Sequence, residues 1–155
     1  MRNDAETFWL EPVYLIDFNI PTEDVDAVLN SVTEAVSLAY GAYDQVAFIS
    51  SPGMEQFRSL DGSRAGKQES MRRVPTSRVS FSIPKDPAVL DKAIAAIRLA
   101  HPYEEPVVNV GDGWASRARG NGDEDNPHRW WNRRKKQGPR ERSGEIEPPG
   151  PEDAK

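Results

Sequence analysis

The stretch VPTSRVSFSIPKDPAVLDKAIAAIRLAHPYEEPVVNV, Val74 to Val110, predicts a strand, a helix and a second strand in succession. Its first part alternates apolar and polar side chains, which is typical of a strand with one buried face. The apolar members are Val79, Phe81 and Ile83. Its middle part repeats apolar residues at steps of three and four, which predicts a helix with one buried stripe. That stripe consists of Val89, Leu90, Ala93, Ile94, Ile97 and Ala100. PVVNV then predicts a short strand that ends at the glycines Gly111 to Gly113.

The ends of this helix carry their own signals. Pro84 closes the preceding strand, Asp86 is suited to the N-cap, and Pro87 fits the first turn, where a missing N–H costs nothing. The pair His101-Pro102 ends the helix, because a residue before proline is pushed away from helical angles.

An earlier part of the chain repeats the same order of elements. PVYLIDFNIP, residues 12–21, predicts a strand whose more apolar face holds Tyr14, Ile16, Phe18 and Ile20. Thr22 is a good N-cap for the helix that follows, and Tyr40-Gly41 is expected to end that helix. The helix stripe consists of Val25, Val28, Leu29, Val32, Val36 and Ala39. QVAFISS, residues 45–51, predicts the next strand.

Two strand–helix–strand halves in one chain predict an α+β fold of the ferredoxin-like plan, βαβ-βαβ, with one layer of sheet and one of helices. The glycines and serines after residue 51 predict an inserted hairpin or loop around the extended MEQFRSL. We expect an N-terminal lead-in at 1–11, the folded domain at 12–114 and a disordered charged Pro/Gly-rich tail at 115–155, with local order around Trp130-Trp131.

Composition excludes several classes of chemistry. The chain of 155 residues has no cysteine, so disulfides, thiolate metal sites and a cysteine nucleophile are excluded. No leader or apolar run long enough for a membrane is visible, which predicts a cytoplasmic protein. Residues 1–114 carry 10 basic and 17 acidic side chains, which argues against a nucleic-acid-binding body. The basic run RRKKQGPRER beside Trp130-Trp131 leaves weak nucleic-acid contact through the tail as an option.

The stretch HPYEEP, residues 101–106, places candidate ligands before the last strand. His101, Glu104 and Glu105 suit a divalent metal such as zinc or copper. In an extended segment adjacent carboxylates point to opposite sides, so all three ligands converge only with help from another element or subunit. The alternative is architectural: the histidine caps the helix, Tyr103 packs, and the glutamates bond to backbone or arginine. The same divergence disfavours an acid/base pair, and no catalytic motif is present, so we expect no enzyme and no catalytic residue.

Four ordered motifs together resemble a known domain. GAYDQVAF (41–48), SPGMEQFRSLDGS (51–63), the strand 74–84 and AIRLAHPYEEPVV (96–108) are similar to the PII/CutA-like domain inserted in YqfO-type proteins of the dinuclear-metal, GTP-cyclohydrolase-I-type-2-like family. The resemblance covers roughly residues 12–112 and also extends to standalone proteins of this kind. HPYE followed by proline is shared with CutA proteins, which are ferredoxin-like trimers implicated in divalent-cation tolerance.

The resemblance implies a homotrimer with sites between subunits. In PII-like folds a long loop covers such a cleft, so basic residues of the 51–74 loop become candidates for binding an anionic effector. The candidates are Arg58, Arg64, Lys67 and Arg73, together with Tyr43, for which packing of its turn is the alternative. A solvated, mobile loop is the alternative for the basic group.

Two departures from the family pattern limit what is carried over. The pattern G-x-G-x-F-x-P reads Gly53 to Ser59 here, with Glu55 and Ser59 in place of a glycine and the proline. The lobes that hold the two metals in YqfO-type proteins have no expected counterpart, so we expect no dinuclear-metal chemistry. The favoured function is a small non-enzymatic trimeric binding or regulatory protein with an intersubunit site for a small anion or metal. The alternatives are a divalent-cation tolerance protein and a partner-interaction module acting through its basic tail.

Overall fold

The structure, a computed structural model, describes residues 7–120 and 123–133. The chain divides into two compact units, Met1–Arg119 and Gly120–Lys155. The described residues of the first unit form β1 (Phe8–Pro21), the 3-10 turn η1 (Thr22–Asp24), α1 (Val25–Ala35), β2 (Phe48–Ile49), β3 (Gly53–Phe57), β4 (Arg72–Pro84), α2 (Pro87–Ala100) and β5 (Val108–Ala118).

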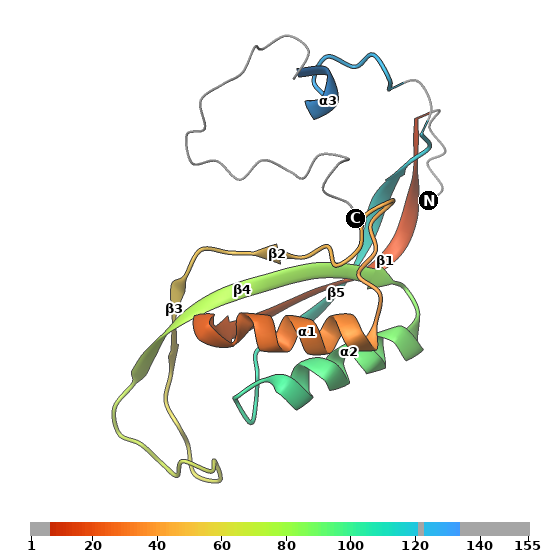
Figure 1. The fold of residues 1–155 in the computed structure, drawn as a ribbon. Helices are drawn as coiled ribbons and strands as arrows, with labels where there is room; N and C mark the ends of the chain where they lie inside the picture. The colour runs from red at the N-terminus through yellow and green to blue at the C-terminus, as the bar shows by residue number, and fades with distance from the viewer. Residues whose placement is uncertain (1–6, 121–122, 134–155) are drawn as a thin grey trace. The chain divides into compact units, whose positions relative to one another are not determined.

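The sheet confirms the predicted fold class. Its strand order is β2-β4-β1-β5, with β3 also paired to β4, and every pairing is antiparallel. Helices α1 and α2 lie side by side against one face of this sheet (Figure 1). The order corresponds to the ferredoxin-like plan, in which the two half-motifs interleave and the first and third main strands become neighbours. None of the helices in the described residues is long and apolar enough to cross a membrane.

The core lies between the sheet and the two helices, on the faces that the sequence pattern predicts. Ile16, Phe18 and Ile20 of β1 are at most 1% exposed, and Val79, Phe81 and Ile83 of β4 are buried beside them. The rings of Phe18 and Phe81 meet edge-on at 6.4 Å between centroids. From the helices, Val28, Val32 and Ile97 contribute fully buried side chains. Helix α2 begins and ends where predicted, and the Asp86 side chain caps it by accepting a hydrogen bond from the Ala88 N–H at 2.8 Å. Its buried residues are Ala93, Ala96 and Ile97, of which Ala96 was not in the predicted stripe.

Strands β1 and β5 are both longer than predicted. β1 begins at Phe8 rather than at residue 12, and β5 continues through the glycines to Ala118, because Phe8–Glu11 pairs with Ala115–Ala118. Gly113, expected near the end of the pattern, lies inside the ladder. A Cβ at this position would lie 2.6 Å from Leu15 Cδ1, so the glycine makes room for that side chain.

The first helix differs from its prediction at both ends. Thr22 is not the N-cap, because it already lies within η1 and its hydroxyl is 3.4 Å from the Ser77 hydroxyl. The helix ends at Ala35, five residues before Tyr40. Val36 adopts extended angles (φ −141°, ψ 151°) and, with Leu38, buries its side chain outside the helix. Gly41 has φ +61° and supports the following turn, where Tyr40 and Tyr43 exchange backbone hydrogen bonds.

The inserted segment forms an arm. β2 comprises only Phe48 and Ile49, and β3 pairs with the N-terminal half of β4 from Gly53↔Thr76 to Phe57↔Arg72. The loop 58–71 joins β3 to β4 and projects beyond the sheet (Figure 1). We call residues 53–73 the β3 arm.

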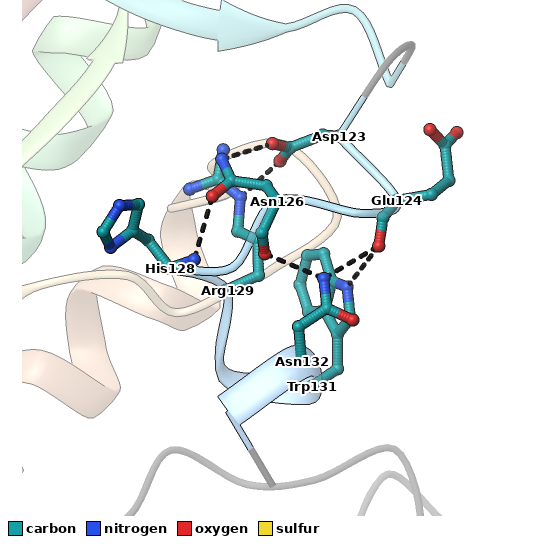
Figure 2. Close-up of polar contacts among 7 residues, drawn as sticks. All are labelled: Asp123, Glu124, Asn126, His128, Arg129, Trp131 and Asn132. Atoms are coloured by element: carbon teal, nitrogen blue, oxygen red, sulfur yellow. Dashed lines mark hydrogen bonds and ion pairs between the residues drawn. The ribbon is translucent and has the colours of Figure 1, made fainter. Parts of the chain in front are cut away.

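The second unit has local order around the tandem tryptophans. Residues 123–133 include the short helix α3 (Trp130–Arg133), and a polar network holds this segment (Figure 2). The Asp123 carboxylate accepts hydrogen bonds from the side chains of Asn126 and Arg129, and the bonds to arginine and asparagine lower its pKa. The Asn132 amide donates to the Glu124 and Asn126 carbonyls, both at 2.8 Å. The predicted disorder of residues 134–155 lies outside the described residues.

Candidate ligand site at the base of the β3 arm

His101 is held on both ring nitrogens. Its side chain is 7% exposed, with Nε2 at 2.7 Å from the Asn19 carbonyl and Nδ1 at 3.0 Å from the Tyr103 amide nitrogen. An amide N–H only donates, so Nδ1 accepts and the proton on Nε2 is donated to Asn19. The imidazole joins the end of α2 to β1 and keeps no free nitrogen within the subunit.

The two glutamates of HPYEEP turn in different directions. The Glu104 carboxylate accepts hydrogen bonds from the Arg64 amide at 3.2 and 3.3 Å, whereas Glu105 pairs with Arg98 at 3.2 Å. The structure therefore does not bring His101, Glu104 and Glu105 together within one subunit. Among residues 7–120 and 123–133 no group of three His, Asp or Glu side chains has metal-site geometry. The metal hypothesis stays a prediction, and the described residues of one chain do not supply a complete ligand set for it.

Tyr103 is the packing residue of this turn. Its ring lies 5.8 Å from the Phe57 ring of β3 and 5.1 Å from the His101 ring. Its hydroxyl is buried and has no hydrogen-bond partner in the described part of the chain. Burial, followed by the nearby negative charge of Glu55, raises the pKa of this phenol above its ordinary value.

Asn19 connects the turn to the arm. Besides accepting from His101 through its carbonyl, its side-chain Nδ2 donates to Glu55 Oε1 at 3.1 Å. Its Oδ1 accepts from Arg78 Nε at 3.4 Å. Asn19, Glu55 and Arg78 were not among the residues predicted from the sequence. The sequence carries no distinct signal for Asn19, because it alternates with buried apolar residues just as Asp17 does.

The predicted basic residues lie along the β3 arm. Arg64 in the loop reaches the HPYEEP turn through Glu104, and Arg73 Nε donates to Gln56 Oε1 across the β3–β4 ladder at 3.0 Å. Lys67 lies 3.9 Å from Glu69, and Arg58 is exposed at the start of the loop. Arg58, Arg64 and Lys67 lie in the loop 58–71, whereas Arg73 lies at the start of β4. Their role in binding an effector stays a prediction.

Tyr43 lies at the other end of the sheet. Its turn contacts β5 near the C-terminal end of that strand, where the Arg117 guanidinium sits 4.0 Å from the Tyr40 ring centroid. The arm contacts the chain just before β5 begins, at Glu104. A strand of that length spans roughly 30 Å at about 3.3 Å per residue. Within one subunit, Tyr43 and the arm loop therefore do not form a common site.

The open face of the sheet, opposite the helices, is hollowed and partly apolar. A depression of about 600 Å³ is lined by residues that include Leu15, Tyr40, Val46 and Phe48. Leu15 and Phe48 are 48% and 69% exposed. Asp17, Ser80 and Ser82 supply polar groups in the same depression.

Known proteins share this architecture over part of their length. No protein-family model matches the chain. Over 93 residues it is 33% identical to the GTP cyclohydrolase 1 type 2 homolog of Mycobacterium bovis and to that of Mycobacterium tuberculosis, covering 59% of this chain and 24% of each relative. The predicted resemblance is confirmed. Because the chain spans about a quarter of the length of these relatives, the likeness does not extend to the whole protein.

One solved structure gives the same partial relationship. The Bacillus cereus protein related to NIF3 aligns with a TM-score of 0.56 at 25% identity, over 67% of this chain and 26% of that one. The divalent ion tolerance protein CutA1 of Ehrlichia chaffeensis aligns with a TM-score of 0.49 at 16% identity, over 65% and 80% of the two chains. The fold assignment itself rests on the strand order of this chain.

Proposed function

We propose that this chain is a small, non-enzymatic binding protein of the PII/CutA-like class, working in the cytoplasm as a homotrimer whose β3 arm responds to a small anionic effector. The observation that carries the proposal is the attachment of the arm. Its loop carries three basic side chains, those of Arg58, Arg64 and Lys67, beside two acidic ones. A few polar contacts and one ring contact hold the arm to the HPYEEP turn.

These contacts are of the kind that a ligand can replace. The Arg64 side chain is 94% exposed in its pair with Glu104, and the Lys67 pair with Glu69 is also solvent-accessible. Exposed ion pairs contribute about 0–1 kcal/mol each, so the loop has little intrinsic preference for one position. An anion with two or more oxygens would form stronger, charge-assisted hydrogen bonds with Arg58, Arg64 or Arg73.

The trimer is proposed to form through the open face of the sheet. Leu15 and Phe48 expose apolar surface there, and burying it against another copy would be favourable. Trimerisation would also be the way to bring Tyr43 of one copy toward the arm of the next, which a single subunit does not do.

Hydrogen exchange of the arm tests the effector proposal. We expect sodium pyrophosphate, citrate or ATP, compared with sodium chloride at equal ionic strength, to slow amide exchange in residues 58–71. Replacing Arg58 and Arg64 together by glutamine should lower the affinity for the anion that slows exchange by roughly tenfold or more, because charged hydrogen bonds are lost. Lys92→Gln, on the exposed face of α2, is the matched control and should bind normally. If none of the three anions changes exchange in the loop, the effector proposal is wrong.

Two further binding experiments distinguish the other two candidate functions. A divalent metal would have to take ligands from two subunits, so zinc or copper binding should disappear when the oligomer dissociates. A tail-driven interaction module should lose its partner after removal of residues 120–155 and keep the properties of the sheet. The cut is placed there because β5 extends to Ala118.

A further inference from the structure

The short helix α3 joins an aromatic pair to a run of cations. Trp130 and Trp131 lie in α3, and their rings meet edge-on at 5.7 Å between centroids. The Trp131 side chain is 39% exposed. The helix ends at the exposed Arg133, and the sequence continues with the basic residues RKK at 134–136. No acidic side chain occurs in the sequence between Arg133 and Glu141, so the indoles are followed by an uninterrupted positive run.

The segment before α3 holds the helix in place and pairs one cation internally (Figure 2). Arg129 donates to the Asp123 carboxylate, so these two charges neutralise each other. The Trp131 indole N–H donates to the Glu124 carbonyl at 3.4 Å, which ties the aromatic pair to the preceding turn. Residues 123–142 carry seven basic and four acidic side chains, so a net positive charge is left after this pairing.

The geometry of the indole pair distinguishes two kinds of anionic partner. A single-stranded nucleic acid stacks successive bases on the faces of aromatic rings. Here the two rings stand at 84° to each other, with the edge of one against the face of the other, so they do not offer two parallel faces. They form instead a compact apolar group beside cations. Tryptophan concentrates at the interface between lipid and water, and basic side chains are attracted to anionic headgroups, so this combination suits a lipid surface.

We propose that residues 130–136 bind the surface of an anionic lipid bilayer, with the two indoles in the headgroup region and the basic run on anionic headgroups. Helix α3 comprises four residues, far fewer than the roughly 20 that span a bilayer, so the contact is peripheral. Residues 1–114 carry an excess of acidic side chains, so the attraction comes from the tail. The proposal is independent of the effector site, because it uses none of the residues of the β3 arm.

Sedimentation of the full chain with lipid vesicles tests the proposal. The vesicles consist of phosphatidylcholine alone or of equal parts phosphatidylcholine and phosphatidylglycerol. The affinity for the anionic vesicles should be higher by roughly tenfold or more, and high salt should lower it, because ions screen the attraction. Equal binding to both kinds of vesicle, or binding to neither, overturns the proposal. Binding to an oligonucleotide of deoxythymidine without binding to vesicles would also overturn it and would identify a nucleic acid as the partner.

A charge variant tests the basic run. Replacing residues 134–136 together by glutamine should lower the affinity for anionic vesicles by roughly tenfold or more and should flatten its salt dependence. The matched control replaces three exposed cations of the first unit, Lys85, Lys92 and Arg98, by glutamine and should bind as the wild type does. An equal loss in both variants would mean that only total charge matters, and the assignment to residues 130–136 would be wrong.

An aromatic variant tests the indoles. Replacing Trp130 and Trp131 together by alanine should lower the affinity for anionic vesicles by roughly tenfold, because interfacial apolar burial is lost, and should leave the salt dependence in place. Trp114→Ala is the matched control, since this tryptophan of the first unit is 51% exposed and its loss should not change vesicle binding. Circular dichroism checks that each variant is folded. Unchanged affinity in the Trp130 and Trp131 variant would overturn the proposed placement of the indoles.

Discussion

At the residue scale, the neighbours His101 and Tyr103 differ in how their polar atoms are satisfied. The imidazole has a partner on each nitrogen, whereas the phenol hydroxyl is buried with none among the described residues. The first arrangement stabilises the helix-to-strand turn, and the second costs free energy at the same place. Substitutions at the two positions are therefore expected to act in opposite directions.

Replacing His101 by alanine should destabilise the fold. The change leaves a cavity and removes the hydrogen-bond partners of the Asn19 carbonyl and the Tyr103 amide, so the free energy of unfolding should fall by about 2–4 kcal/mol. Urea unfolding followed by circular dichroism measures this loss. The matched control is His128→Ala, since that side chain is exposed in the second unit and its substitution should have little effect. An unchanged midpoint for His101→Ala would contradict the architectural role.

Replacing Tyr103 by phenylalanine should stabilise the fold. At pH 7 the variant loses a buried hydroxyl without a partner, so the free energy of unfolding should rise by up to about 1 kcal/mol. The difference in the free energy of unfolding between the variant and the wild type should grow at alkaline pH. The unfolded phenol ionises near pH 10 while the folded one, with its raised pKa, stays neutral, so wild-type stability falls as pH rises above that value.

Unfolding midpoints of the wild type and of Tyr103→Phe, measured between pH 7 and 11, check whether the variant is the more stable one and whether the difference grows with pH. Tyr43→Phe is the control, because that side chain is 66% exposed and its hydroxyl faces solvent. A Tyr103→Phe variant that is less stable than the wild type at neutral pH would mean that the hydroxyl has a partner, and the prediction would fail.

At the scale of elements, periodic stretches were predictable and their ends were less so. The alternation in β4 and the stripe in α2 repeat often enough to fix both the type of element and its buried face. The end of α1 was missed because Val36 continues the apolar stripe although its backbone is extended. The length of β5 was missed because its glycines resemble a terminator, whereas pairing with Phe8–Glu11 keeps them in the strand.

The candidate site was also predictable only in part. The basic residues of the arm are close in sequence, in the loop 58–71 or at the start of β4, so their neighbourhood could be predicted. The Asn19–Glu55 contact joins residues 36 apart, and the Asn19–Arg78 contact joins residues 59 apart. Such contacts depend on strand register, which places β1, β4 and β3 beside one another. No local pattern records that register, so these two contacts required the structure.

At the scale of the whole molecule, the two faces of the sheet have different roles. The helices cover one face and supply the core, whereas the open face carries the depression with Leu15 and Phe48. A stable interface needs about 800 Å² per partner, which a sheet face of this kind can provide. The proposed trimer would cover this apolar surface, while the arm loop, which projects beyond the sheet, would be left to reach a ligand.

Replacing Phe48 by aspartate should dissociate the trimer. The side chain is 69% exposed in one subunit, so the folded monomer should tolerate the change, but a buried aspartate at each interface would oppose assembly. We expect native mass spectrometry to give three times the chain mass for the wild type and a folded monomer for the variant. The loss corresponds to at least about 2 kcal/mol per copy from the missing aromatic burial alone.

Leu99→Asp is the matched control for this experiment. Leu99 is 86% exposed on α2, on the helical side of the molecule, so an aspartate there changes surface charge equally without touching the open face. If both variants stay trimeric, assembly uses another surface, and the Tyr43 contribution to the arm site must come from a different geometry. If the wild type is itself a monomer, the intersubunit anion and metal sites are wrong.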